Sequence, residues 1–408
     1  MGDFLFNGFS FLARFAGNSL VFFWLARLLG ENDFGRLSFL FLLANFALVL
    51  MDFGLYFLVV EAVMKARRYR IAALLRVKYI TSAAGFVLMA AAGYLLFSLR
   101  GQLAADYVPY LLLLLSTAML ALAQHYLYHF RVQNRFRTET FGQTFYSVGI
   151  LLGVGMLSLL DKVSLWSVVI VFVVLRLLFL LVSKWFFGRL YPFPGKQQLR
   201  WPHMLMYLKR SSLYGVTALV GYALLLLDST LMYVLFPDQL PMYQGGVRIV
   251  LMVMMLTEVL TVFFLPRLHG QRPEASRRLY LLLCTILGAT IAVPLWLFPE
   301  FVVSLLYGSA LGELTEYMRY FGLVAVLRIA LGYAGTMLTF HGYHRVRLIS
   351  LSMAIVVFSL VALALVSQFG VEGVLVAVIL AHVVALLYQI LWLQRIQAGL
   401  AVSGEVKT

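Results

Sequence analysis

The sequence predicts an all-α, polytopic membrane protein with twelve transmembrane helices in two six-helix lobes. The composition is the first reason: of 408 residues, 63% are hydrophobic and 12% are charged, whereas a soluble domain carries about 25% charged residues. The second reason is that apolar runs of about 20 residues recur from end to end. The third is that the basic residues gather in alternate connections between these runs, as membrane topology requires.

Each predicted span is an apolar run that is long enough to cross the bilayer. The first run, from Phe4 onward, lacks a basic leader and a small-residue cleavage site, so we interpret it as a span and not as a removable signal peptide. The predicted spans are 5–28, 36–60, 79–99, 107–130, 140–160, 164–187, 207–236, 241–265, 279–299, 318–340, 348–367 and 371–393.

The orientation follows from the charges. Most of the 32 lysines and arginines fall in every second connection, which places these connections and both termini in the cytoplasm. The net charge of +15 is spread over short loops, so we do not expect nucleic acid as a partner. The basic segment 61–78 is expected to lie along the inner surface against anionic lipids. The expected location is a bacterial inner membrane.

The two halves of the chain resemble each other in topology. Tight outside turns at 29–37 and 235–243 lie about half a chain apart, and each joins two helices. An even number of helices in each half preserves the orientation, so the predicted repeat is parallel, about an axis along the membrane normal. The predicted domains are an N-lobe over 1–187, a cytoplasmic linker over 188–206 and a C-lobe over 207–408.

Four arginines lie inside the apolar runs: Arg14, Arg176, Arg248 and Arg328. Each costs about 2.5–3.5 kcal/mol at the centre of a membrane helix, so such residues usually serve a function. We expect them to hold an anionic substrate in a cavity, although Arg176 has no polar stripe around it and a structural role is equally open. Polar residues on the same helix faces, or on a neighbouring one, are the other predicted cavity contacts: Asn18, Tyr214 and Gln244.

Three acids in or near the spans are predicted to bind a coupling ion, H⁺ or Na⁺: Asp52, Asp228 and Glu258. The alternative is structural pairing, of Arg14 with Asp52 or of Arg248 with one of the other two acids. Four arginines outnumber three acids, so pairing would still leave a cavity of slight positive charge.

Other chemistry is poorly represented. His125 and His129 have a metal-ligand spacing, but an interfacial aromatic belt explains their surroundings better. His382 is either a proton carrier or a packing residue. The sequence contains no phosphate-binding glycine loop, catalytic triad order or zinc motif, so we expect no cofactor, no metal and no enzyme. A polymerase or ligase would need a larger outside loop than 300–317.

Several motifs resemble the Wzx-type polysaccharide flippases of the multidrug/oligosaccharidyl-lipid/polysaccharide exporter (MOP) superfamily. The most specific is LARLLGENDFG at 25–35, and MDFGL at 51–55 resembles the end of the family's second helix. The hairpin from Leu227 to Arg248 and the outside turns at 305–308 and 370–373 follow in the family's order. The resemblance covers essentially the whole chain.

The resemblance implies a flippase that carries undecaprenyl-diphosphate-linked oligosaccharide, such as an O-antigen repeat, to the periplasmic leaflet by alternating access through a cationic cavity. It implies roles for Arg248 and Asp228, and less directly for Arg14. Expected partners are the lipid-linked substrate, a polysaccharide polymerase and a chain-length regulator, with the chain working as a monomer. The alternatives are a drug/cation antiporter or a peptidoglycan-precursor flippase of the same superfamily, and a polymerase or ligase.

Overall fold

The computed structural model describes residues 16–56, 58–59, 68–133, 135–190, 201–268 and 273–399. Arg14, residues 61–67 of the basic segment and the middle of the predicted linker lie outside these ranges. Every regular element in the described residues is a helix. They are η1 (Ala16–Leu20), α2 (Val21–Leu29), α3 (Glu31–Asp52), α5 (Arg68–Leu99), α6 (Leu103–Val132), α7 (Phe136–Leu159), α8 (Leu165–Leu190), α9 (Trp201–Leu235), η2 (Pro237–Gln239), α10 (Leu240–Leu268), α11 (Pro273–Leu297), α12 (Pro299–Tyr307), α13 (Leu314–Phe340) and α14 (His344–Gln397).

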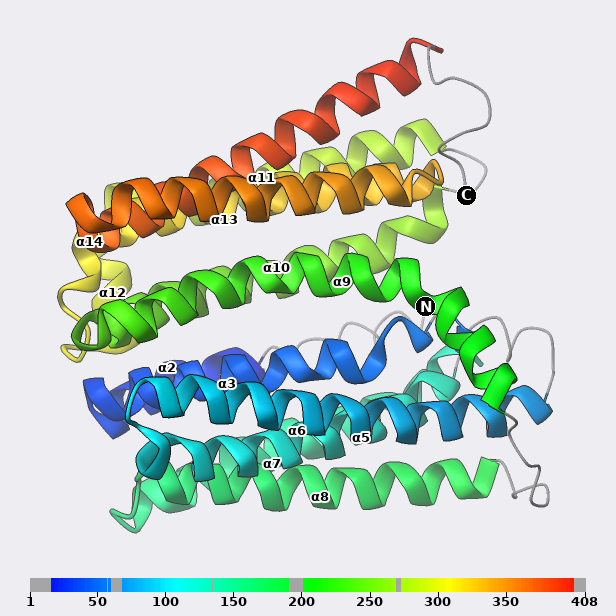
Figure 1. Cartoon of the computed structure of the whole chain (residues 1–408), viewed down its shortest axis with the longest axis horizontal. Coiled ribbons are helices and arrows are strands. Elements are labelled where there is room, and N and C mark those ends of the chain that lie inside the picture. Colours follow the sequence, from blue (N-terminus) through cyan, green and yellow to red (C-terminus); the bar gives the residue numbers. More distant parts are fainter. Residues whose placement is uncertain are drawn as a thin grey trace. The chain divides into compact units, whose positions relative to one another are not determined.

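Ten of the described helices are long and apolar enough to cross a membrane. One of them, α14, contains two predicted spans, because the chain reverses at Gly370 (φ 55°, ψ −127°) (Figure 1). The first predicted span lies partly outside the described residues and continues into η1 and α2. The prediction of an all-α polytopic membrane protein is confirmed. The short helix α12 was not predicted and occupies part of the outside connection 300–317.

The described chain forms two compact units. The N-unit contains Met1–Leu29 and Arg36–Tyr222, and the C-unit contains Gly30–Gly35 and Ala223–Thr408. The division therefore falls inside α9 and not in the connection before it. The predicted lobe bounds, with a linker at 188–206, stay a prediction.

In the N-unit, α6 packs against α5, α7 and α8, and these long helices run lengthwise beside one another in Figure 1. An aromatic cluster of Phe22, Phe41 and Phe172, each 0–3% exposed, joins α2, α3 and α8. A charged contact supports the start of α6, where Arg36 forms an ion pair with the buried Asp106 at 2.6 Å. Apolar packing and this ion pair hold the N-unit together.

The end of α3 depends on a glycine. Phe53 and Gly54 both have positive φ values (40° and 75°), which end the helix in a tight turn. A Cβ on Gly54 would lie 2.8 Å from the Ser211 carbonyl oxygen and 2.9 Å from the Gly215 nitrogen. A Cβ on Gly215 would lie 2.8 Å from the Phe53 carbonyl. Two glycines thus allow the backbone of this turn to touch the first half of α9.

In the C-unit, α13 is central and packs against α10, α11 and α14. Its contacts include an apolar cluster around Phe264 and Tyr280, whose rings stack with centroids 5.1 Å apart. The two halves of α14 are tied to each other by a hydrogen bond of 2.8 Å from Gln389 Nε2 to Ser350 Oγ. These contacts position the polar residues of α10, α13 and α14 that are described next.

Candidate functional site

A small, mostly apolar cavity with three polar side chains in its wall lies inside the C-unit, among helices α9, α10, α13 and α14. Its volume is about 10 Å³, which is roughly the room that one water molecule needs. The lining residues are Leu225, Asp228, Tyr243, Val247, Val250, Phe321, Val324, Arg328, Leu375 and Val378.

Asp228 is the buried acid of this cavity and is only 3% exposed. Its carboxylate accepts hydrogen bonds from the Tyr243 hydroxyl and from the Ser229 backbone N–H. Arg328, on α13, acts on it electrostatically. Sequence reasoning predicted both charged residues as functional, but it did not predict that they share a cavity. An acid held by one hydroxyl, one amide and one nearby cation can exchange a proton or bind a small ion.

Two predicted contacts on α10 are also buried. Arg248 is 6% exposed and interacts electrostatically with Tyr307, whose hydroxyl donates to the Gly245 carbonyl at 2.7 Å. The cation that acts on Asp228 is Arg328, so the geometry does not favour the alternative in which Arg248 pairs with this acid. Gln244 is fully buried, and neither polar atom of its carboxamide has a hydrogen-bond partner in the described part of the chain. A buried amide without a partner costs about 1–3 kcal/mol, which suggests that it serves a ligand or water.

His382 on α14 is fully buried close to the same cavity. Its Nδ1 lies 2.6 Å from the Val378 carbonyl oxygen, and Arg328 acts on it electrostatically. Its Nε2 has no hydrogen-bond partner among the described residues. Arg328 therefore stands near an acid and near a histidine, which keeps the proton-carrier alternative for His382 open.

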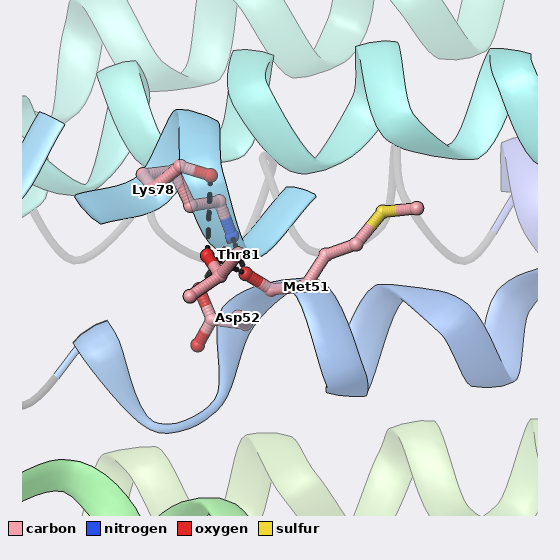
Figure 2. A network of polar contacts seen from close by, with 4 residues as sticks. All are labelled: Met51, Asp52, Lys78 and Thr81. Carbon is pink, nitrogen blue, oxygen red and sulfur yellow. Dashed lines mark hydrogen bonds and ion pairs between the residues drawn. The ribbon is translucent and has the colours of Figure 1, made fainter. Parts of the chain in front are cut away.

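The acid Asp52 belongs to a different network, in the N-unit. Figure 2 shows its carboxylate accepting a hydrogen bond of 3.0 Å from Lys78 Nζ. Lys78 also donates to the Met51 carbonyl at 3.2 Å, and the Thr81 hydroxyl donates to that carbonyl at 2.8 Å. Lys78 is 1% exposed. Sequence reasoning had placed it in a cytoplasmic loop, because it stands at the edge of a basic segment.

Arg176 is held inside the N-unit and is 1% exposed. Its Nε donates to the Tyr146 hydroxyl at 3.0 Å, and its Nη1 donates to Ser116 Oγ at 3.0 Å and to Thr117 Oγ1 at 2.8 Å. Its guanidinium also lies over the rings of Phe41 and Phe172, 5.0 and 5.6 Å from their centroids. Such surroundings stabilise a buried cation and favour the structural alternative for Arg176.

The remaining predicted site residues are scattered. Tyr214 is half-buried in the N-unit, where its Cβ faces Gly54. Glu258 is exposed, so the expectation of a buried acid on α10 is wrong: its position on the helix turns it away from the packed interior. Asn18 lies in η1, but its side chain is outside the described part, as is the whole of Arg14.

The histidine pair on α6 is buried inside the N-unit. His125 and His129 are both fully buried, and their rings meet edge to face at 5.4 Å. Phe187 of α8 covers His129 at 5.0 Å. The aromatic-belt interpretation of this stretch stays a prediction. Within the described ranges, no group of three metal-ligating side chains is close enough to hold a metal ion.

Solved structures share this fold over 96% of the chain. An inward-facing MATE family multidrug transporter of the MOP superfamily matches with a TM-score of 0.73 and 15% identity, over 96% of its own length. The MATE multidrug transporter DinF-BH matches at 0.70 and 17%, over 95%. The lipid II flippase MurJ, in an inward closed conformation, matches at 0.70 and 14%, over 87%.

No protein-family profile matches the sequence, and neither does any curated protein sequence. The chain therefore has the fold of these MATE transporters and of MurJ.

Proposed function

We propose that this protein, built on the fold of MATE transporters and MurJ, is a flippase for an undecaprenyl-diphosphate-linked oligosaccharide. It would move this lipid from the cytoplasmic to the periplasmic leaflet by alternating access. The observation that carries the proposal is the charge inside the C-unit. Arg248 and Arg328 project from α10 and α13, and Asp228 is the one buried acid among the described residues of this unit. The interior is therefore cationic.

A lipid diphosphate fits such an interior chemically. A diphosphate cannot cross hydrocarbon without a polar path, and arginine is the side chain whose planar donors match phosphate oxygens best. A hydrogen bond to a charged group contributes about 1.5–3 kcal/mol net, so two arginines would favour a diphosphate over an uncharged headgroup. The unpartnered carboxamide of Gln244, one turn from Arg248, adds donors that suit a sugar or a phosphate oxygen.

The cavity at Asp228 is our proposed coupling site, and H⁺ fits it better than Na⁺. Sodium needs several oxygen ligands, whereas this wall offers one carboxylate and one phenol, and Arg328 would repel a metal cation. Protonation of Asp228 would weaken its attraction to Arg328 and release this arginine toward an anion. Asp52 is occupied by Lys78 and Glu258 is exposed, so Asp228 is the strongest of the three predicted ion-binding acids.

The alternatives receive less support. A drug/cation antiporter should present an acidic interior to its substrate, and the described interior of the C-unit is basic. A peptidoglycan-precursor flippase remains the second candidate, since MurJ shares the fold and the same class of lipid diphosphate would suit the arginines.

We further propose that the protein lies in a bacterial inner membrane, with both termini in the cytoplasm and in contact with anionic lipids. It would work as a monomer, together with a polysaccharide polymerase and a chain-length regulator.

The test is transport in proteoliposomes by Arg248→Ala. A lipid-linked oligosaccharide is incorporated together with the protein, and a membrane-impermeant lectin measures the fraction that reaches the outer leaflet. We expect Arg248→Ala to slow flipping about 10- to 100-fold, since one charged contact is lost at the diphosphate. Arg319→Ala, an exposed arginine on α13, is the matched control and should flip normally. A wild-type protein that does not accelerate flipping would refute the proposed function.

A further inference from the structure

Arg347 of the C-unit is partly buried and belongs to none of the sites described above. Arg347 stands in the first turns of α14, where sequence reasoning placed it in a cytoplasmic loop. Its backbone carbonyl accepts a hydrogen bond of 2.8 Å from Ser350 Oγ, and Gln389 donates to the same hydroxyl at 2.8 Å. The second half of α14 thus fixes the backbone from which Arg347 projects.

The guanidinium of Arg347 lies across α13. Its Nη1 donates a long hydrogen bond of 3.4 Å to Thr339 Oγ1, and Thr339 in turn donates to the Gly335 carbonyl at 2.8 Å. A Cβ on Gly335 would stand 3.0 Å from Arg347 Nε and 3.5 Å from its Cζ. Gly335 therefore provides the space in which the guanidinium rests.

Arg347 has no carboxylate partner among the described residues. Its side chain is partly exposed, so some of its five N–H donors remain available for an anion. Of the groups near this end, His344 lies beside Arg347, and Arg277 is paired with Glu274 at 3.5 Å. A guanidinium without a carboxylate in such surroundings favours an anionic ligand.

Hydroxyl groups stand beside this arginine. The Tyr280 hydroxyl interacts with it electrostatically and lies 3.0 Å from Thr261 Oγ1 and 3.2 Å from Thr336 Oγ1. Thr261 and Thr336 are themselves 3.2 Å apart. Three helices therefore contribute hydroxyls next to the guanidinium, and these hydroxyls donate to one another and to the carbonyls of Thr257 and Gly332, so these described polar neighbours of Arg347 include no acid.

We propose that Arg347 is a phosphate-binding residue at the end of the C-unit that the charge pattern places at the cytoplasmic face. Resting on the proposed function, it would receive the diphosphate headgroup before Arg328 does. Thr339, its contact on α13, lies eleven residues beyond Arg328, which corresponds to about 16 Å along the helix. Arg328 and the Thr339 contact of Arg347 then lie at two depths on one face of α13. A headgroup would pass from Arg347 to Arg328.

The test measures binding of inorganic pyrophosphate to the purified full-length protein by calorimetry. Arg347→Gln should weaken this binding about tenfold, the effect of losing one charged contact. Arg345→Gln removes an exposed arginine two residues away and should leave the affinity unchanged. Equal affinities for Arg347→Gln and wild type, or equal losses in both variants, would overturn the proposal.

A second pair of variants keeps the charge and covers the case in which Arg347→Gln does not fold. Gly335→Ala places a methyl group 3.0 Å from Arg347 Nε and should weaken pyrophosphate binding. Gly312→Ala, where nothing lies within 4 Å, should not. Unchanged binding in a folded Gly335→Ala protein would contradict the assigned geometry.

The source of the phosphate is tested with two short-chain lipids. A short prenyl diphosphate should bind in an Arg347-dependent manner, whereas binding of a short phosphatidylglycerol should not change in Arg347→Gln. The reverse result would make Arg347 a contact for membrane lipid and overturn its role in headgroup transfer. Flipping by the wild-type protein is measured in a separate experiment. If pyrophosphate binding depends on Arg347 but the wild-type protein does not flip lipid, the proposed function is refuted while the phosphate site is still supported.

Discussion

The two units treat their buried charges differently. In the N-unit, Arg176 is surrounded by three hydroxyls and two rings, and Lys78 is paired with Asp52. In the C-unit, the buried Arg248 and the partly exposed Arg328 accompany a single buried acid, and Gln244 has no partner in the described part. A buried charge that is satisfied inside its own unit serves stability. An excess of charge with unsatisfied polar atoms beside it indicates a ligand that the fold alone does not supply.

Among the variants that test this difference between the units, Arg176→Ala should have the largest effect on the free energy of unfolding. The change removes three charge-assisted hydrogen bonds and opens a cavity among α6, α7 and α8, so the free energy of unfolding should fall by about 3–5 kcal/mol. Unfolding in a denaturing detergent series measures it. Arg176→Met fills the volume and should fold, since apolar replacement of a buried charge is often tolerated. A folded Arg176→Met protein without transport would mean that Arg176 acts on the substrate, and the contrast would fail.

Breaking the ion pair of Lys78 with Asp52 should have a smaller effect than Arg176→Ala. Lys78→Met leaves the Asp52 carboxylate without its cation, and the free energy of unfolding should fall by about 2 kcal/mol, less than for a fully buried pair because Asp52 keeps 21% exposure. The double variant Asp52→Asn with Lys78→Met should recover most of this loss in a double-mutant cycle. Additive losses, with no coupling between the two changes, would show that the pair contributes nothing to the N-unit.

Gly54 in the turn after α3 and Gly101 in the turn after α5 form a matched pair of glycines with positive φ. Gly54→Ala combines a positive φ of 75° with a Cβ 2.8 Å from the Ser211 carbonyl oxygen, and should destabilise the protein by about 2–3 kcal/mol. Gly101→Ala has a similar φ of 68° but nothing within 4 Å, so it should cost about 1 kcal/mol. The difference in the free energy of unfolding isolates the contact with α9. Equal costs would indicate that this contact does not contribute.

The smallest change in stability is expected for Gln244→Leu, which should not destabilise the protein. Removing a buried amide that lacks a described partner should leave the unfolding free energy unchanged or raise it by about 1 kcal/mol. Flipping in proteoliposomes should nevertheless slow about tenfold, because a ligand contact is lost. A Gln244→Leu protein that flips at the wild-type rate would remove this residue from the substrate path and weaken the interpretation of the C-unit.

Much of the architecture was predictable. Span lengths, apolar runs and the alternation of basic connections are local properties of the chain, and they yielded the all-α membrane fold that the described helices confirm. The reversal at Gly370 agrees with the predicted turn at 370–373 between two spans. The helix α12 shows the limit of this approach, because it is too short to stand out in a loop.

The candidate site was predictable only in part. The rarity of charge in apolar helices pointed to Arg248, Arg328 and Asp228, and all three lie in the interior of the C-unit. Lys78 and Arg347 were missed because they stand at the edges of basic segments. There, the sequence does not distinguish a buried cation from one in a loop or one that extends to the membrane surface. Each is drawn inward by a partner on another helix, which no spacing rule encodes.

The sequence by itself determined that this protein crosses a membrane many times and carries more arginines than acids in its spans, because hydrophobicity and charge are properties of single residues. Only the tertiary structure decided which charges are satisfied. Arg176 meets hydroxyls from α6 and α7 and becomes a packing residue, whereas Asp228, Arg328 and His382, from three distant segments, meet around one small cavity. The cost of a buried charge depends on the partners within a few ångströms, and those partners are assembled by helix packing.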